Sequence, residues 1–150
     1  MLEYQHQEAR LTLGDGLREY YASREGLVGG RGISEAARTF FRCHDAAHVV
    51  FGCTTSLPDE GVVKLWSFFG TTAGLRLLRD YRLPESQEIY EQLGWREMLA
   101  AARTAIPAIP RVLWRARQMR KRWPWSGFEG YLGVPLGELR GEFGIRLLTR

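Results

Sequence analysis

The chain has 150 residues, of which 45% are hydrophobic and 25% charged, and its formal net charge is +4. These values are typical of globular proteins, so they exclude a largely disordered chain and predict one domain with its own core. The two cysteines, Cys43 and Cys53, form no Cys-x-x-Cys pair, which excludes a disulfide scaffold and a cysteine-based zinc finger. No secretory signal and no apolar stretch of roughly 20 residues is found, so we expect a soluble or membrane-surface protein.

The first third of the chain predicts two helices separated by glycine-rich loops. A short helix is expected at about residues 17–22, between loops rich in glycine. Ser34 marks the start of a second helix, because residues 36–51 contain neither glycine nor proline and carry apolar side chains at helical spacing. A connecting loop is expected over residues 53–58.

The rest of the chain predicts further helices and no strand. Ser56 and Asp59 have the form of a capping pair for a strongly apolar helix that continues through Leu78. The later helices are expected at 86–105, with a kink or restart at Pro107 and Pro110, at 111–122 and at 136–143. The sequence therefore predicts an all-α protein, a helical bundle in which residues 1–150 form a single domain. The short loop at 53–58 makes its two flanking helices an antiparallel pair.

Four side chains on this helix pair form a candidate metal site. His44 and His48 lie four residues apart, so their imidazoles stand on one face of a helix. Glu60 opens the next helix, after a loop short enough to turn it back toward the histidines. Asp45 can supply a further oxygen ligand or hold an imidazole in its tautomer. Such a set suits a divalent ion, zinc first, with manganese, iron, cobalt and magnesium as alternatives.

Other interpretations of these residues stay open. Two histidines at this spacing can also be satisfied core side chains. An adjacent His-Asp pair marks a class of helical metal phosphohydrolases as well, but that class gives no use to His48 or Glu60. A zinc protease is disfavoured, because Asp45 stands where the helix of such a protease carries its catalytic glutamate.

The string His44-Asp45-Ala46-Ala47-His48, followed after eleven residues by Glu60, resembles the signature of a known family. This is the coenzyme Q (ubiquinone) biosynthesis protein four family. Lys64 follows the glutamate by four residues, as it does in that family. The end of the chain, from Trp125 through Leu139-Arg140 to Gly144-Ile145, is similar to the family's closing pattern. The resemblance covers roughly residues 17–145 and is that of a divergent bacterial member.

The resemblance implies an all-helical fold and a metal-dependent activity. The family's reaction is the oxidative decarboxylation of a polyprenylated 4-hydroxybenzoate, in which a hydroxyl replaces the ring carboxylate. The ion would offset negative charge on the substrate. The alternative is a non-catalytic scaffold that binds isoprenoid lipid and other quinone-biosynthesis proteins around a structural metal; a homodimer is a further open possibility. The residues implied as catalytic, as metal ligands or as their immediate support, are His44, Asp45, His48 and Glu60.

The apolar helix is a candidate lipid-binding element. It is apolar around most of its circumference, which is typical of the central helix of a bundle or of a helix that lines a hydrophobic groove. Gly70 and Gly74, four residues apart, leave a smooth strip where a helix or a prenyl chain can lie close. The candidate groove residues are Trp66, Phe69, Gly70 and Gly74. The resemblance favours the prenyl chain, because family members bind isoprenoid tails.

Residues 111–122 are strongly basic, contain no acidic side chain and are followed by two tryptophans. Aromatic residues beside a basic amphipathic segment suit the interface of an anionic membrane, with a plain solvated helix face as the alternative. No nucleic-acid-binding module accompanies the segment, so no nucleic-acid partner is expected. The candidate membrane-surface residues are Arg111, Arg115, Arg120, Lys121 and Trp123. We therefore expect a cytoplasmic protein attached peripherally to the inner face of a bacterial plasma membrane.

Overall fold

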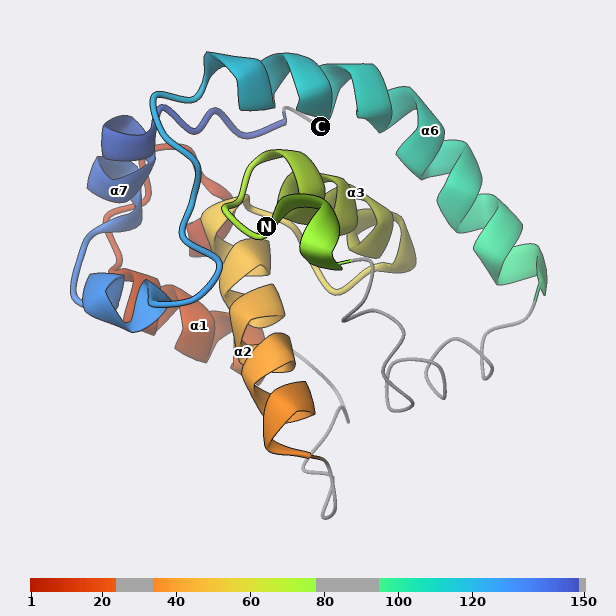
Figure 1. Ribbon diagram of the computed structural model, residues 1–150. Coiled ribbons are helices and arrows are strands. Elements are labelled where there is room, and N and C mark those ends of the chain that lie inside the picture. The colour runs from red at the N-terminus through yellow and green to blue at the C-terminus, as the bar shows by residue number, and fades with distance from the viewer. Residues whose placement is uncertain (24–33, 78–94, 149–150) are drawn as a thin grey trace.

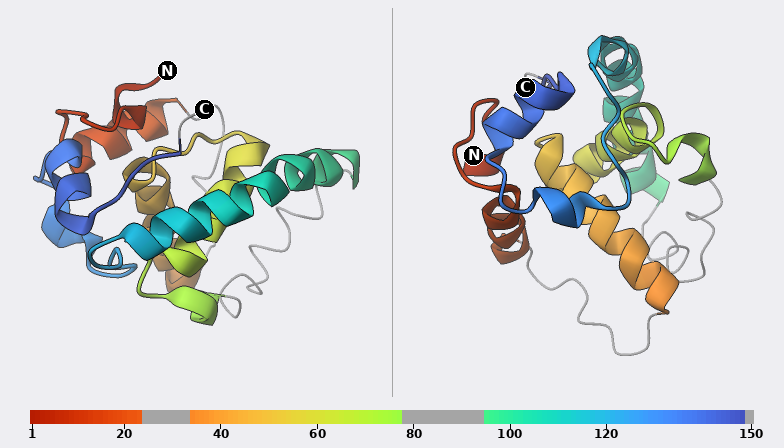
Figure 2. Two further views of the ribbon diagram at one scale, coloured as in Figure 1. Left: turned by 90° about the horizontal axis from the view of Figure 1, so that it is seen from above. Right: turned by 60° about the vertical axis from the view of Figure 1, so that its left-hand side comes forward.

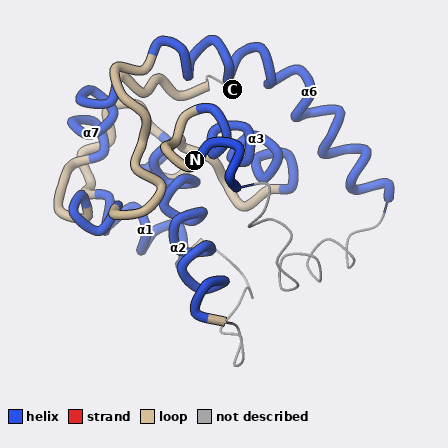
Figure 3. The backbone as a smooth tube through the Cα atoms, in the orientation of Figure 1, coloured by secondary structure: helices blue, strands red, loops and turns tan. Residues whose placement is uncertain are grey.

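The computed structural model describes residues 1–23, 34–77 and 95–148. Its helices are α1 (Leu13–Ala22), α2 (Glu35–Val50), α3 (Leu57–Phe69), α6 (Trp95–Gln118) and α7 (Leu136–Phe143) (Figure 1). Short 3-10 turns occur at Glu3–Gln5, Gly74–Arg76 and Phe128–Tyr131. Extended backbone pairs only in two isolated bridges within these described ranges, and no strand is drawn in Figure 3. The all-α prediction is therefore confirmed.

The helices lie around a core that α2 and α3 share. α6 arches along α3, while α1 packs against α2 (Figure 1), and Figure 2 shows the same order from two other directions. Large aromatic side chains fill the space between them: Trp66 of α3, Trp123 after α6, and Tyr4 and Tyr20 near the N-terminus are all fully buried. Burial of this apolar area is the main driving force that holds the helices together.

Local capping explains where α1 and α2 begin. The side chain of Thr12 accepts a hydrogen bond from the Asp15 backbone N–H at 3.1 Å, and Asp15 caps Thr12 in return. α1 therefore starts at Leu13, four residues before the predicted short helix. The side chain of Ser34 caps α2 in the same way, through the backbone N–H of Ala37 at 3.2 Å, which confirms the predicted start.

The start of α3 differs from the prediction. The Ser56 side chain makes no capping hydrogen bond. Asp59 instead accepts hydrogen bonds from the backbone N–H and the hydroxyl of Thr54, both at 2.5 Å. The predicted Ser56–Asp59 capping pair is thus wrong. The carboxylate of Asp59 is used to tighten the loop between α2 and α3.

The end of α3 also differs, because the helix stops at Phe69 and does not reach Leu78. After Gly70 the backbone turns to the segment that follows α6. The Trp123 N–H donates to the Gly70 carbonyl at 2.9 Å, and the Thr72 N–H donates to the Trp123 carbonyl at 2.9 Å. These long-range bonds replace the helical ones that would have continued α3.

α6 is a single helix through Pro107 and Pro110, where the sequence predicted a kink or a restart. Both prolines lie on its exposed side, where carbonyls that lose their helical partner can bond to water. The expected separate basic helix is therefore the last part of α6, which ends at Gln118 and not at Arg122. The predicted start at Ser86 lies outside the described residues. The last helix, Leu136–Phe143, matches the prediction.

Candidate metal centre

α2 places two histidines side by side in the protein interior. Its residues from Cys43 to Val50 are all buried, which leaves His44 8% exposed and His48 fully buried. The four-residue spacing puts both imidazoles on the same side of the helix, with their ring centroids 4.8 Å apart. Buried imidazoles need polar partners, so the surroundings of their ring nitrogens decide what the pair can do.

α3 brings a carboxylate to this pair. Glu60 lies in the first turn of α3, where the short loop after α2 reverses the chain direction. Its Oε1 lies 3.1 Å from Nε2 of His48, and its Oε2 lies 3.3 Å from Nε2 of His44. The two Nε2 atoms lie 3.2 Å from each other. The predicted approach of Glu60 to the histidines is confirmed, and the three residues form a buried group that could hold a metal ion.

The spacing of these atoms fits a metal centre. Four ligands at about 2.0–2.1 Å from a tetrahedral zinc ion lie about 3.3–3.4 Å from one another. The 3.2 Å between the two Nε2 atoms is close to such an edge, and each Nε2 atom lies 3.1 or 3.3 Å from a different oxygen of the Glu60 carboxylate. The Nδ1 atom of His48 is buried and has no hydrogen-bond partner among the described residues, so the polar contacts of this ring are concentrated at Nε2. The donor set therefore fits a divalent ion.

Aromatic rings hold the two imidazoles in place. The Phe40 ring stacks on His44, with centroids 6.0 Å apart and an interplanar angle of 14°. The Tyr20 ring of α1 lies against His48, with centroids 5.1 Å apart. Such packing restricts ring rotation and so fixes the direction of each Nε2 atom. Sequence reasoning missed the role of both aromatic residues.

Asp45 does not join the three ligand atoms. It is buried, 7% exposed, but the group that could hold a metal contains only His44, His48 and Glu60 among the described residues. Its charge does act on the neighbouring ring, since it raises the pKa of His44 slightly against stronger opposing effects. Asp45 is therefore not one of the three candidate ligand residues, and the supporting role stays a prediction.

The environment prepares the group to bind a cation. Burial lowers the pKa of His44, and this effect outweighs the raising effect of its hydrogen bond with Glu60, so the imidazole is neutral at neutral pH. Burial raises the pKa of Glu60, but hydrogen bonds from His44 and His48 lower it more, and the carboxyl is ionised. An imidazole with a lone pair and an ionised carboxylate are the forms that bind a metal.

The predicted lipid groove is not formed as expected. Gly70 and Gly74 do not share a helix face, because α3 ends at Phe69 and Gly74 adopts a positive φ of 55° in a separate turn. A Cβ added to Gly70 would lie 2.9 Å from the Trp66 ring, so this glycine lies directly against the core. Trp66 itself is fully buried and stacks on Phe51. The continuous strip of small residues is therefore a wrong prediction.

The predicted membrane-surface residues are divided among different environments. Arg111 and Arg120 are exposed, whereas Arg115 is half-buried. Lys121 forms an ion pair with Glu142. Trp123 is fully buried in the core, so its assignment to the surface is wrong. None of the described helices is long and apolar enough to span a membrane.

Sequence reasoning also missed Arg140, which is fully buried. Its guanidinium donates to the carbonyls of Val49 and Val50 at the end of α2, at 2.8 and 2.9 Å. It also donates to the carbonyls of Tyr4 and His6 in the N-terminal segment, at 2.6 and 2.5 Å. The last carbonyls of a helix lack helical partners, and a cation is favourable there. The residue was noticed only as part of the Leu-Arg pair in the closing pattern.

Fold and site together define an all-helical protein with a buried His-His-Glu group that could bind a metal ion. No family model, no curated protein and no solved structure matches this chain. The arguments for its function therefore come from its own residues and from the motif resemblance.

We expect the purified protein to carry about one divalent ion per chain, most favourably zinc. Replacing His44 and His48 together with alanine removes two of the three candidate ligands and should abolish binding. Elemental analysis by mass spectrometry measures the ratio of metal to protein. His6→Ala, which changes the remaining, exposed histidine, should leave the ratio unchanged. Equal metal content in the double variant and the parent would remove the site assignment.

Proposed function

We propose that the chain is a metal-dependent decarboxylase of prenylquinone (ubiquinone) biosynthesis, acting on a polyprenylated 4-hydroxybenzoate-type ring. The observation that carries this proposal is the convergence of His44, His48 and Glu60 on one buried point. These residues are the ones in which the motif resembles the quinone-biosynthesis family. The spacing of the motif in the sequence and the short distances between the side chains thus support the same three residues as candidate ligands.

The reaction breaks the bond between the ring and its carboxyl carbon and forms a carbon–oxygen bond at the same ring position. It is a two-electron oxidation, and we assign dioxygen as the oxidant. With water as the source of the hydroxyl, one aromatic acid, one water and one dioxygen give one phenol, one carbon dioxide and one hydrogen peroxide. A bound divalent ion would supply Lewis-acid stabilisation of negative charge on the substrate oxygens.

The chain's own residues would hold this ion and bind the ring. His44, His48 and Glu60 would be its ligands, and Asp45 would support the ring of His44. A hollow of about 530 Å³ is lined in part by Phe40, Cys43 and Trp125, and its lining does not include His44, His48 or Glu60. The Phe40 ring stacks on His44 and also contacts Trp125, with centroids 5.8 Å apart. The aromatic side chains of this hollow would suit an aromatic substrate, and Phe40 links the hollow to His44.

A substrate labelled in its carboxyl carbon tests the proposal. We expect the metal-loaded protein to release labelled carbon dioxide from a prenylated 4-hydroxybenzoate and to form the ring-hydroxylated product in equal amount, in the presence of dioxygen. Mass spectrometry measures both products. The alternative function is a scaffold that binds isoprenoid lipid and other quinone-biosynthesis proteins around a structural metal. Co-purifying lipid without any turnover under these conditions would favour the scaffold over the enzyme.

We also propose that the outward face of α6 contacts an anionic membrane, as on the cytoplasmic side of a bacterial plasma membrane. Ile106, Pro110 and Trp114 are spaced four residues apart and are all exposed, Ile106 by 62% and Trp114 by 63%. Arg103 and Arg117, both exposed, lie three residues beyond the ends of this row. Apolar side chains flanked by cations suit the boundary between lipid headgroups and acyl chains.

The protein should therefore sediment with anionic liposomes, remain in the supernatant with neutral ones and dissociate at high salt, which screens charge within a Debye length. Trp114→Ser should weaken binding, because it removes the most exposed ring from the face. Tyr21→Ser, which removes an exposed ring on α1, should not. Co-sedimentation measures the bound fraction. Equal binding to anionic and neutral liposomes would contradict this role of α6.

A further inference from the structure

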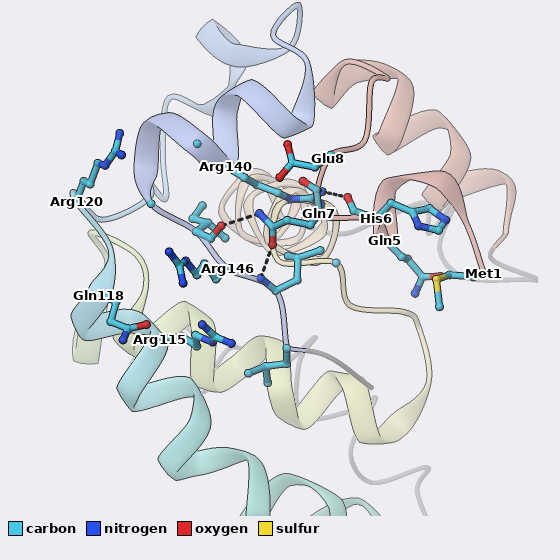
Figure 4. A pocket seen from close by; sticks show the side chains of 16 residues that line it. Met1, Gln5, His6, Gln7, Glu8, Arg115, Gln118, Arg120, Arg140 and Arg146 are labelled. Carbon is cyan, nitrogen blue, oxygen red and sulfur yellow. Dashed lines mark hydrogen bonds between the residues drawn. The ribbon is translucent and has the colours of Figure 1, made fainter.

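A hollow of about 1010 Å³ lies where the N-terminal segment meets the end of the chain (Figure 4). Most of its lining comes from residues 5–8, the end of α6 with the turn after it, and residues 144–148, and Met1, Gly52, Arg140 and Gly141 complete it. His44, His48 and Glu60 do not line it. The hollow is therefore separate from the candidate metal centre.

Arginine dominates the charge of this hollow. Arg115, Arg120 and Arg146 line it, and Figure 4 shows Arg115 and Arg146 projecting into it from two different segments. No carboxylate in the described part of the chain forms an ion pair with any of the three. Glu8 is the acidic side chain among the described lining residues, and its charge acts on Arg140. The hollow thus has an excess of positive charge.

Arg140 also lines the hollow and adds to its charge, although its guanidinium is not free to bind a ligand. Its guanidinium is engaged by backbone carbonyls on all sides. Burial lowers the pKa of Arg140 to about 10, so it is still cationic at neutral pH. A buried cation raises the potential of the hollow that it lines, because the protein interior screens charge weakly, and Glu8 offsets part of this effect.

Hydrogen bonds anchor the backbone beside two of these arginines, Arg146 and Arg120. The Gln7 side chain donates to the Ile145 carbonyl at 2.9 Å and accepts from the Leu147 N–H at 2.8 Å, so it anchors the backbone on both sides of Arg146. The Arg120 N–H donates to the Phe143 carbonyl at 2.9 Å, which ties the turn after α6 to the same region. The backbone on which Arg146 and Arg120 stand is thus tied to neighbouring segments, which lowers the cost of ordering these side chains around a ligand.

We propose that this hollow, with Arg115, Arg120 and Arg146, is a binding site for a phosphate group. The planar guanidinium fork matches the oxygens of a phosphate through paired hydrogen bonds, and several arginines can share one dianion. Gln118, exposed at the same wall, offers an additional amide donor. The phosphate can belong to a small soluble phosphate or diphosphate compound, or to the headgroup of an anionic lipid.

Calorimetric titration with inorganic pyrophosphate tests the site directly. The parent protein should bind, and Arg115→Gln combined with Arg146→Gln should lower the affinity about tenfold or more for each guanidinium removed. The control, Arg38→Gln, removes an exposed arginine on α2 that does not line the hollow and should bind like the parent. Thermal melts establish that each variant is folded, and the single variant Arg146→Gln, at an exposed position, serves if the double variant is not.

A second arm distinguishes the two sources of phosphate. Vesicles of neutral lipid with and without phosphatidic acid are titrated into the same proteins. Pyrophosphate binding that is lost in the arginine variants supports a soluble phosphate ligand. Phosphatidic-acid binding that is lost in them, without pyrophosphate binding by the parent, supports a headgroup. If the variants bind both probes as well as the parent, or if the parent binds neither at millimolar concentration, the proposal is overturned.

Discussion

Glu60→Gln should lower the turnover of a prenylated 4-hydroxybenzoate about 10²- to 10³-fold, because removing one charge-stabilising group commonly costs this much. Glutamine keeps the size of the side chain and its place in the first turn of α3, so the protein should stay folded. It removes the negative charge that lies 3.1 and 3.3 Å from the two imidazoles. Product formation is measured at saturating metal and substrate, with metal content determined in parallel.

Glu138→Gln provides the matched control, since it makes the same chemical change at an exposed position of α7. It should retain parental turnover. A scaffold would respond differently to the Glu60 change, because its lipid and protein partners would stay bound and cells carrying the variant would still make quinone. Full complementation of a strain lacking the gene by folded Glu60→Gln protein would contradict the catalytic role.

Arg140→Met should lower the free energy of unfolding by about 3–5 kcal/mol, because it leaves buried carbonyls without donors. Methionine keeps much of the length of the side chain but donates no hydrogen bond. Four of the bonds lost join the end of α2 to the N-terminal segment, at 2.5 to 2.9 Å. Denaturant titration followed by circular dichroism measures the change.

Arg38→Met is the control for this prediction. Arg38 is exposed on α2, so the same substitution there should change stability by no more than about 0.5 kcal/mol. Arg140→Lys should recover only part of the loss, because a lysine ammonium cannot reproduce the planar fork of donors. If Arg140→Met were as stable as the parent, the guanidinium would not be what holds the end of α2 to the N-terminal segment.

The features that depend on nearby residues were predictable from the sequence. The helical character of the chain, the start of α2 at the Ser34 cap and the bounds of α7 match the structure. The histidine pair was predictable for the same reason, since a four-residue spacing on a helix places two side chains on one face. The position of Glu60 beside the histidines was predictable because the loop between α2 and α3 is too short for the two helices to lie apart. In each case the interaction joins residues close together in the chain.

The features that depend on distant residues were decided only by the tertiary structure. α3 ends at Phe69 because backbone hydrogen bonds to Trp123, more than 50 residues later, replace its next helical bonds. Trp123 is buried and not at the surface for the same reason. Arg140 joins carbonyls more than 90 residues away, which no local pattern reveals. Periodicity and capping specify which residues are helical. Where a helix ends and where a polar side chain points depend on which groups, near or distant in the chain, form hydrogen bonds with it.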